Sequence, residues 1–172
     1  MTNLGPGVPN NVNPLVTPTI IFTPTPSVTS TVRIANNSGY VAYIGGVDVS
    51  QFNGLPLPPG NRPIDLQNCP YTVYSCSPVT NIGNTTTVTI TSAVAAGSTV
   101  LTNTGTFGTS FVPGNVIVLG NTGKGQEVLT IAGTGATTLT VATTTLYDHA
   151  TSVTVSTATM QAVNITATAG EL

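Results

Sequence analysis

The sequence predicts an all-β protein with an extended, Pro-rich N-terminal arm followed by two small β-sandwich or β-barrel modules. Two observations predict this class. Apolar residues alternate with Thr, Ser and Asn at a period of two, and no segment shows the period of a helix. Gly, Pro and Asn pairs interrupt the alternation at short intervals, as the turns of a sandwich or barrel do. Glycines do not recur at fixed offsets, which disfavours a β-helix.

Residues 1–30 are expected to form the arm, because they hold six of the thirteen prolines and this spacing prevents a helix. Ile20, Ile21 and Phe22 form an apolar, β-prone patch there with no room for a local partner strand. A flexible linker is one interpretation. The apolar patch favours the other, an arm that lies along a neighbouring subunit by strand addition or groove binding. The partner-binding residues of this arm would be Leu15, Val16, Ile20, Ile21 and Phe22.

The first module is predicted over residues 31–80. Its expected strands, with a loop at 53–61 between the second and third, are 28–35, 40–44, 64–66 and 71–75. Tyr40, Tyr43 and Tyr74 fall in these strands, where aromatic rings serve core packing or an interface. A dedicated carbohydrate platform is weakly supported, because the chain has no Trp.

The second module is predicted over residues 85–172, after a Ser-Pro and Asn-Ile-Gly-Asn boundary at 77–86. Its expected strands are 87–91, 99–101, 115–119, 127–131, 138–142, 152–156 and 162–166. Turns with Gly or Pro-Gly separate most of them.

Charge is scarce: 5% of the residues are charged, with three cations, five acids and one His. Dispersed cations disfavour nucleic-acid binding and a polybasic membrane contact. Neighbouring Asp148 and His149 point to opposite faces of a strand, so a role in satisfying backbone groups is favoured over a catalytic triad, which would need a distant carboxylate. Glu127 is expected to pair with Lys124. We therefore predict no enzyme activity, catalytic residue, cofactor or metal.

Cys69 and Cys76 are predicted to be reduced and buried. In one extended strand their Cα atoms would lie roughly 23 Å apart, too far for a disulfide. A turn at Pro70 or a partner chain would still allow a bridge.

The chain lacks an apolar run long enough to span a bilayer, and its opening residues lack the pattern of a signal peptide. Synthesis and release in a cytoplasm are therefore expected. With few charges to protect strand edges, the edges are expected to be covered by partner subunits in a permanent assembly.

Two segments resemble known modules. The run from Val32 through the Asn36-Asn37-Ser38-Gly39 turn and Tyr43-Ile44-Gly45-Gly46 to Gly54–Gly60 and Tyr71–Ser75 resembles small β-sandwich modules of tailed-bacteriophage virion proteins. The run from Pro113-Gly114 through Gln126–Ile131 to Leu146–Ala150 is similar to a β-barrel-like module of phage structural proteins and of secreted bacterial accessory domains.

This resemblance implies a non-enzymatic virion structural protein, of the capsid decoration or head-fibre type, assembled in the host cytoplasm. Its implied partners are the major capsid protein and copies of itself, with a trimer expected from the three-fold sites of capsid lattices. The alternative is a tail-fibre or minor tail module that binds host-surface glycans, which would need a groove with clustered aromatic and carboxylate residues.

Overall fold

The computed structural model describes residues 9–12, 14–24, 30–83, 86–121 and 125–171. Every strand pair given by the structure is antiparallel, and these residues contain no α-helix. The predicted all-β class is therefore confirmed. Within the same ranges there is no helix with the length and apolarity needed to cross a bilayer.

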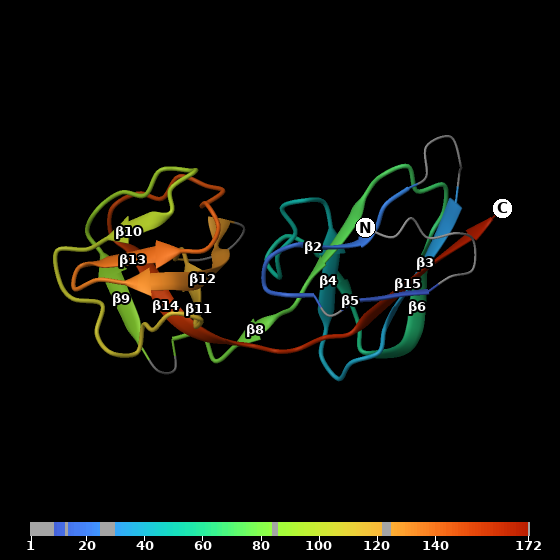
Figure 1. Ribbon diagram of the computed structural model, residues 1–172, viewed down its shortest axis with the longest axis horizontal. Coiled ribbons are helices and arrows are strands. Elements are labelled where there is room, and N and C mark those ends of the chain that lie inside the picture. Colours follow the sequence, from blue (N-terminus) through green and yellow to red (C-terminus); the bar gives the residue numbers. More distant parts are fainter. Residues whose placement is uncertain (1–8, 13, 25–29, 84–85, 122–124, 172) are drawn as a thin grey trace. The chain divides into compact units, whose positions relative to one another are not determined.

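The chain folds into two units, and the second is inserted into the first. Unit 1 combines Met1–Pro78 with Gln161–Leu172, and unit 2 comprises Val79–Met160. The chain enters unit 2 after strand β7 (Val73–Cys76) and returns to unit 1 before β15 (Ile165–Glu171) (Figure 1). At the crossing, the backbone N–H of Gln161 donates to the Pro78 carbonyl at 2.9 Å.

Unit 1 is a β-sandwich of two four-stranded sheets. The first sheet, in spatial order, consists of β1 (Pro9–Val12), β15, β3 (Ser30–Asn36) and β6 (Gly60–Leu66). The second consists of β2 (Thr19–Phe22), β7, β4 (Ala42–Gly45) and β5 (Leu55–Leu57).

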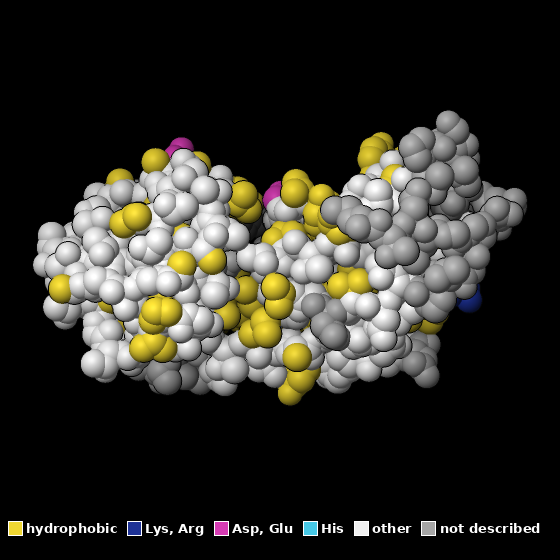
Figure 2. Space-filling view, viewed as in Figure 1, with side chains coloured by type: hydrophobic (Ala, Val, Ile, Leu, Met, Phe, Trp, Pro, Cys, Tyr) yellow, Lys and Arg dark blue, Asp and Glu magenta, His cyan; other side chains and the backbone are white. Residues whose placement is uncertain are grey.

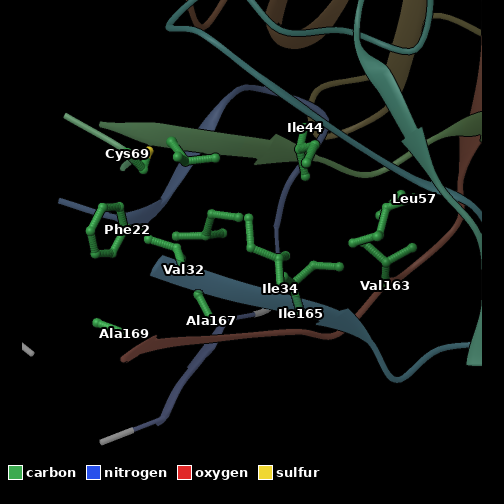
Figure 3. Close-up of a cluster of buried hydrophobic side chains, with 13 residues drawn as sticks. Phe22, Val32, Ile34, Ile44, Leu57, Cys69, Val163, Ile165, Ala167 and Ala169 are labelled. Atoms are coloured by element: carbon green, nitrogen blue, oxygen red, sulfur yellow. The ribbon is translucent and has the colours of Figure 1, made fainter. Parts of the chain in front are cut away.

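The inner faces of these sheets form one apolar core (Figure 3). Val32 and Ile34 of β3 and Ile165 of β15 have no exposed surface, because every second residue of these strands faces inward. Ile44 of β4 and Leu57 of β5 contribute from the second sheet.

Unit 2 has a separate core and one larger sheet. Its path is β10 (Val100–Thr102), β13 (Thr138–Val141), β12 (Glu127–Thr134), β11 (Val116–Leu119), β14 (Val153–Met160) and β8 (Val79–Thr80), and β9 (Thr87–Ile90) also pairs with β14. The T-shaped ring pair Phe107–Phe111, with centroids 5.6 Å apart, is buried in this core.

The predicted boundaries are wrong at both ends of the chain. Residues 161–171, assigned to the second module at 85–172, belong to unit 1, since β15 pairs with β1 and β3. Residues 9–12 and 19–22, assigned to the arm at 1–30, are strands of unit 1. Alternation along a strand identifies its buried face and not its partner, so neither pairing was visible in sequence. Positions 1–8, 13 and 25–29 of the predicted arm lie outside the described residues.

One predicted loop is also a strand. Leu55–Leu57, read as part of a Pro-rich loop, pairs with Ala42–Ile44 as β5. Pro56 is compatible with this position because β5 is an edge strand of the second sheet.

The few surface charges of unit 1 lie partly along one sheet edge. Edge strand β6 carries Arg62, Pro63 and Asp65, and Arg33 of the neighbouring strand pairs with Asp65. Charges and proline at an edge oppose pairing with another strand. On the face drawn in Figure 2, uncharged surface dominates and charged atoms are few.

We predict that Ile165→Ala lowers the free energy of unfolding by about 2–5 kcal/mol, because Ile165 is fully buried in the core of unit 1. Urea unfolding followed by tyrosine fluorescence would measure this, since four of the five tyrosines belong to unit 1: Tyr40, Tyr43, Tyr71 and Tyr74. Thr168→Ala in the same strand is the control, with an expected loss under about 1 kcal/mol. Equal effects of the two substitutions would contradict this placement of β15.

Candidate functional site

Unit 1 contains a pocket of about 800 Å³ that residues of both its sheets line. Its walls are the end of β4 with Gly45 and Gly46, the first residue of β5, the end of β6, and the connection 67–72 that leads into β7. Its lining residues are Ile44, Gly45, Gly46, Leu55, Asp65, Leu66, Gln67, Asn68, Cys69, Pro70, Tyr71, Thr72 and Val73.

The pocket has an apolar floor and an exposed apolar rim. Ile44, Cys69 and Val73 are buried and also belong to the core of unit 1, so the floor is continuous with the core. Figure 3 shows Ile44 and Cys69 within this cluster. At the rim, Tyr71 is 75% exposed and Leu55 is 56% exposed. Two large apolar side chains thus stand in solvent at one opening.

Polar groups of the rim come from the connection between β6 and β7. Gln67 and Asn68 are exposed and Thr72 is half-buried. Asn68 has a φ of 51°, a left-handed conformation that Asn tolerates better than most residues. Next to it, the Cys69 thiol donates to the Tyr71 carbonyl at 3.4 Å and tightens the turn that carries the Tyr71 ring.

Among the lining residues, the one charged side chain is already paired. Arg33 Nε and Nη2 donate to the two carboxylate oxygens of Asp65 at 2.8 and 2.9 Å. These hydrogen bonds hold the pKa of Asp65 below its ordinary value, so the carboxylate stays ionised and the guanidinium neutralises it. The pocket therefore presents no net charge to a ligand.

The sequence predictions did not include this pocket. They placed Tyr71 in a strand at 71–75, whereas β7 begins at Val73 and Tyr71 lies in the preceding connection. An aromatic residue directly after Cys-Pro, between two strand patterns, is the one signal that could have indicated it.

The predicted arm residues do not share one surface. Ile21 and Phe22 are buried in unit 1's own core, because β7 provides β2 with the partner strand that the sequence did not reveal. Ile20 is half-buried and Val16 is buried. Leu15 alone of the five is exposed, at 56%.

Leu15 is held on a fixed backbone. Its carbonyl accepts from the Ser77 N–H at 2.8 Å, and its own N–H donates to Thr19 Oγ1 at 3.2 Å. The Ser77 hydroxyl also donates to the Pro14 carbonyl. Because Pro14 and Val16 on either side are buried, the Leu15 side chain projects from an anchored segment.

The candidate interface aromatics differ in accessibility. Tyr40 is 49% exposed, whereas Tyr43 and Tyr74 are half-buried in β4 and β7. None of the three lines the pocket.

In unit 2, the imidazole of the chain contacts a distant carboxylate. His149 Nε2 lies 2.8 Å from Glu127 Oε1, and both side chains are buried. Glu127 also accepts from the backbone N–H groups of Leu146 and Tyr147, at 2.6 and 3.1 Å. A carboxylate only accepts, so Nε2 carries the proton. The pair thus attaches the 146–149 segment to β12.

Two predictions concern the residues of this arrangement. Glu127 contacts His149, and its predicted pairing with Lys124 stays a prediction because Lys124 lies outside the described residues. Asp148 accepts from the Ala96 N–H at 2.8 Å, the backbone-satisfying role predicted for it. His149 and Glu127 are 8% and 4% exposed.

Cys69 and Cys76 are free and buried, as predicted. Burial raises the pKa of the Cys76 thiol to about 12. Over the described ranges, no three His, Cys, Asp or Glu side chains are placed to hold a metal ion.

No family model, curated protein or solved structure matches this chain.

We predict that Glu127→Gln destabilises unit 2 by about 1–3 kcal/mol, because an amide nitrogen would replace one acceptor oxygen beside donors that are already placed. Differential scanning calorimetry would show a lower melting temperature. Asp148→Asn, which keeps an oxygen for the Ala96 N–H, should change stability by under about 0.5 kcal/mol. A wild-type melting temperature for Glu127→Gln would show that the contact adds no stability.

We also predict that Cys76 resists alkylation in the folded protein. Its thiol titrates near 9.0 when unfolded and near 12 when folded, so burial of the neutral thiol stabilises the fold below pH 9. This contribution is lost as pH rises between these values. In a Cys69→Ser variant at pH 8, iodoacetamide should label Cys76 slowly in buffer and rapidly in urea. Equal labelling rates would contradict its burial.

Proposed function

We propose that the protein is a non-enzymatic virion structural protein that binds and stabilises a capsid surface, as a decoration or head-fibre protein does. Its partners would be the major capsid protein and further copies of itself, as a trimer on the virion. The resemblance of two segments to phage virion modules supports this proposal, together with the all-β architecture.

The observation that carries the proposal is the presentation of Leu15. An apolar side chain 56% exposed on a segment fixed by Ser77 and Thr19 loses little entropy when it enters a pocket of a partner. Burying an exposed Leu side chain at an interface contributes about 1.5–3 kcal/mol from the apolar surface removed from water. Of the five predicted contact residues of the arm, we therefore keep Leu15 in the proposal, since Ile21 and Phe22 are core residues.

The chemistry of unit 2 supports a structural role. The imidazole and the carboxylate beside it are used to hold a loop, at 8% and 4% exposure. General acid–base catalysis needs such groups within hydrogen-bonding reach of a substrate.

We predict that Leu15→Ser weakens attachment to particles by at least about tenfold, because it removes the apolar contact and leaves the backbone anchor intact. Co-sedimentation of the purified chain with isolated virions depleted of it would give the affinity. Val47→Ser is the matched control, since Val47 is 70% exposed in the same unit.

Deletion of residues 1–26 would be a poor alternative test, because it removes β1 and β2 and two core side chains.

Mass photometry of Leu15→Ser and Val47→Ser would report whether either substitution changes self-association. Unchanged sedimentation of Leu15→Ser, or an equal loss for Val47→Ser, would refute attachment through Leu15. Absence of sedimentation for the wild-type chain would refute particle binding itself.

A further inference from the structure

The pocket of unit 1 combines an aromatic ring, amide side chains and a neutral rim at a single opening. We propose that it is a binding site for a neutral saccharide. This inference depends on the pocket alone and is independent of particle attachment through Leu15.

The Tyr71 ring would form the stacking surface. It is 75% exposed, and Pro70 stands next to it at the same rim. The C–H groups of one face of a pyranose pack on an aromatic ring in the way other apolar groups do, and the phenol hydroxyl remains free to hydrogen bond. The turn that carries the ring is fixed by the Cys69–Tyr71 hydrogen bond, which lowers the ordering cost of binding.

The side chains of Gln67, Asn68 and Thr72 supply both donors and acceptors. Sugar hydroxyls also donate and accept, so these groups match them without a charge. The left-handed φ of Asn68 places its amide on a tight turn beside the opening, where a ligand can reach it.

Charge selects against other ligand classes. Asp65, the one charged residue among those that line the pocket, is neutralised by Arg33 through two hydrogen bonds. A phosphate or an acidic peptide would find no free cation there, and a cationic ligand would compete with the guanidinium. A neutral ligand needs no cation in the pocket and does not compete with Arg33 for Asp65.

The size and floor of the pocket fit a small oligosaccharide. A volume of about 800 Å³ falls in the range of pockets that enclose small-molecule ligands. The floor of Ile44, Cys69 and Val73 suits the apolar face of a sugar. An apolar peptide segment is the competing occupant. Its apolar side chains would cover the exposed amides of Gln67 and Asn68, whereas the hydroxyls of a sugar pair with both.

Nitrogen-15 NMR of the full chain, titrated with maltotriose, lactose and chitotriose, tests the proposal. We expect at least one of these saccharides to shift the backbone amide signals of Asn68, Tyr71 and Thr72, with a Kd of about 1 mM or tighter. Tyr71→Ser and Asn68→Gly should each weaken binding at least about fivefold. Glycine is favoured at a positive φ, so Asn68→Gly removes the amide without straining the turn.

Two matched controls should bind as the wild type does. Tyr40→Ser removes an exposed ring of unit 1 that does not line the pocket, and Ser152→Gly relaxes a positive φ of 68° in unit 2. Thermal melts would verify that each variant folds.

Three results would overturn the proposal: no shift with any of the three saccharides, binding that both pocket variants retain, or equal losses in the controls. Binding of the dye anilinonaphthalene sulfonate that Tyr71→Ser abolishes, without saccharide binding, would identify the pocket as an apolar site and overturn the saccharide proposal. Because Leu15 does not line the pocket, Leu15→Ser should retain saccharide binding, and the two proposals can fail separately.

Discussion

The architecture of unit 1 depends on the pairing of β15 in the interior of its first sheet. This C-terminal strand forms seven residue pairs with β3 and four with β1, and its inward side chains Ile165, Ala167 and Ala169 complete the core. Its neighbours in the sheet precede it by more than a hundred residues, with the whole of unit 2 between them. Such non-local pairing makes folding slow, because loop closure must precede most of the stabilising contacts. The first sheet of unit 1 therefore forms only when β15 pairs with β1 and β3, which come from the other end of the sequence.

Some of the few charged residues lie at the edge of a sheet. The expectation was that edges lacking charge would be covered by partner subunits. At the β6 edge, Arg62, Pro63 and Asp65, with Arg33 beside them, oppose pairing with another strand. The other edge strands of unit 1, β1, β2 and β5, carry no charged residue, so their coverage by a partner stays a prediction. In unit 2, the buried Glu127 carboxylate binds the loop that contains Leu146 and His149. The contacts proposed for Leu15 and Tyr71 therefore involve apolar and neutral polar groups.

The sequence predicted the strands well and their partners poorly, for a physical reason. A period of two follows from the geometry of a single strand, so Val32 and Ile34 could be assigned to a buried face from local sequence alone. Pairing is a tertiary property: nothing near Ile21 indicates that β7, some fifty residues later, would cover it. Leu55–Leu57 was misread because Pro56 within it and Pro58 and Pro59 after it signal a loop, yet an edge strand tolerates Pro56. The Tyr71 pocket and the Glu127–His149 contact likewise arise from segments that only the fold brings together.

Both candidate contact sites lie in unit 1, and both use exposed side chains on backbone held by local hydrogen bonds. Leu15 is fixed through Ser77 and Thr19, and Tyr71 through Cys69. Unit 2, by contrast, enters and leaves where Gln161 donates to Pro78, so its ends meet at one hydrogen-bonded point, as the ends of inserted domains commonly do. An insertion of this kind adds a second core without altering the sheets that present Leu15 and Tyr71. The two proposed contact residues, Leu15 and Tyr71, therefore both belong to unit 1.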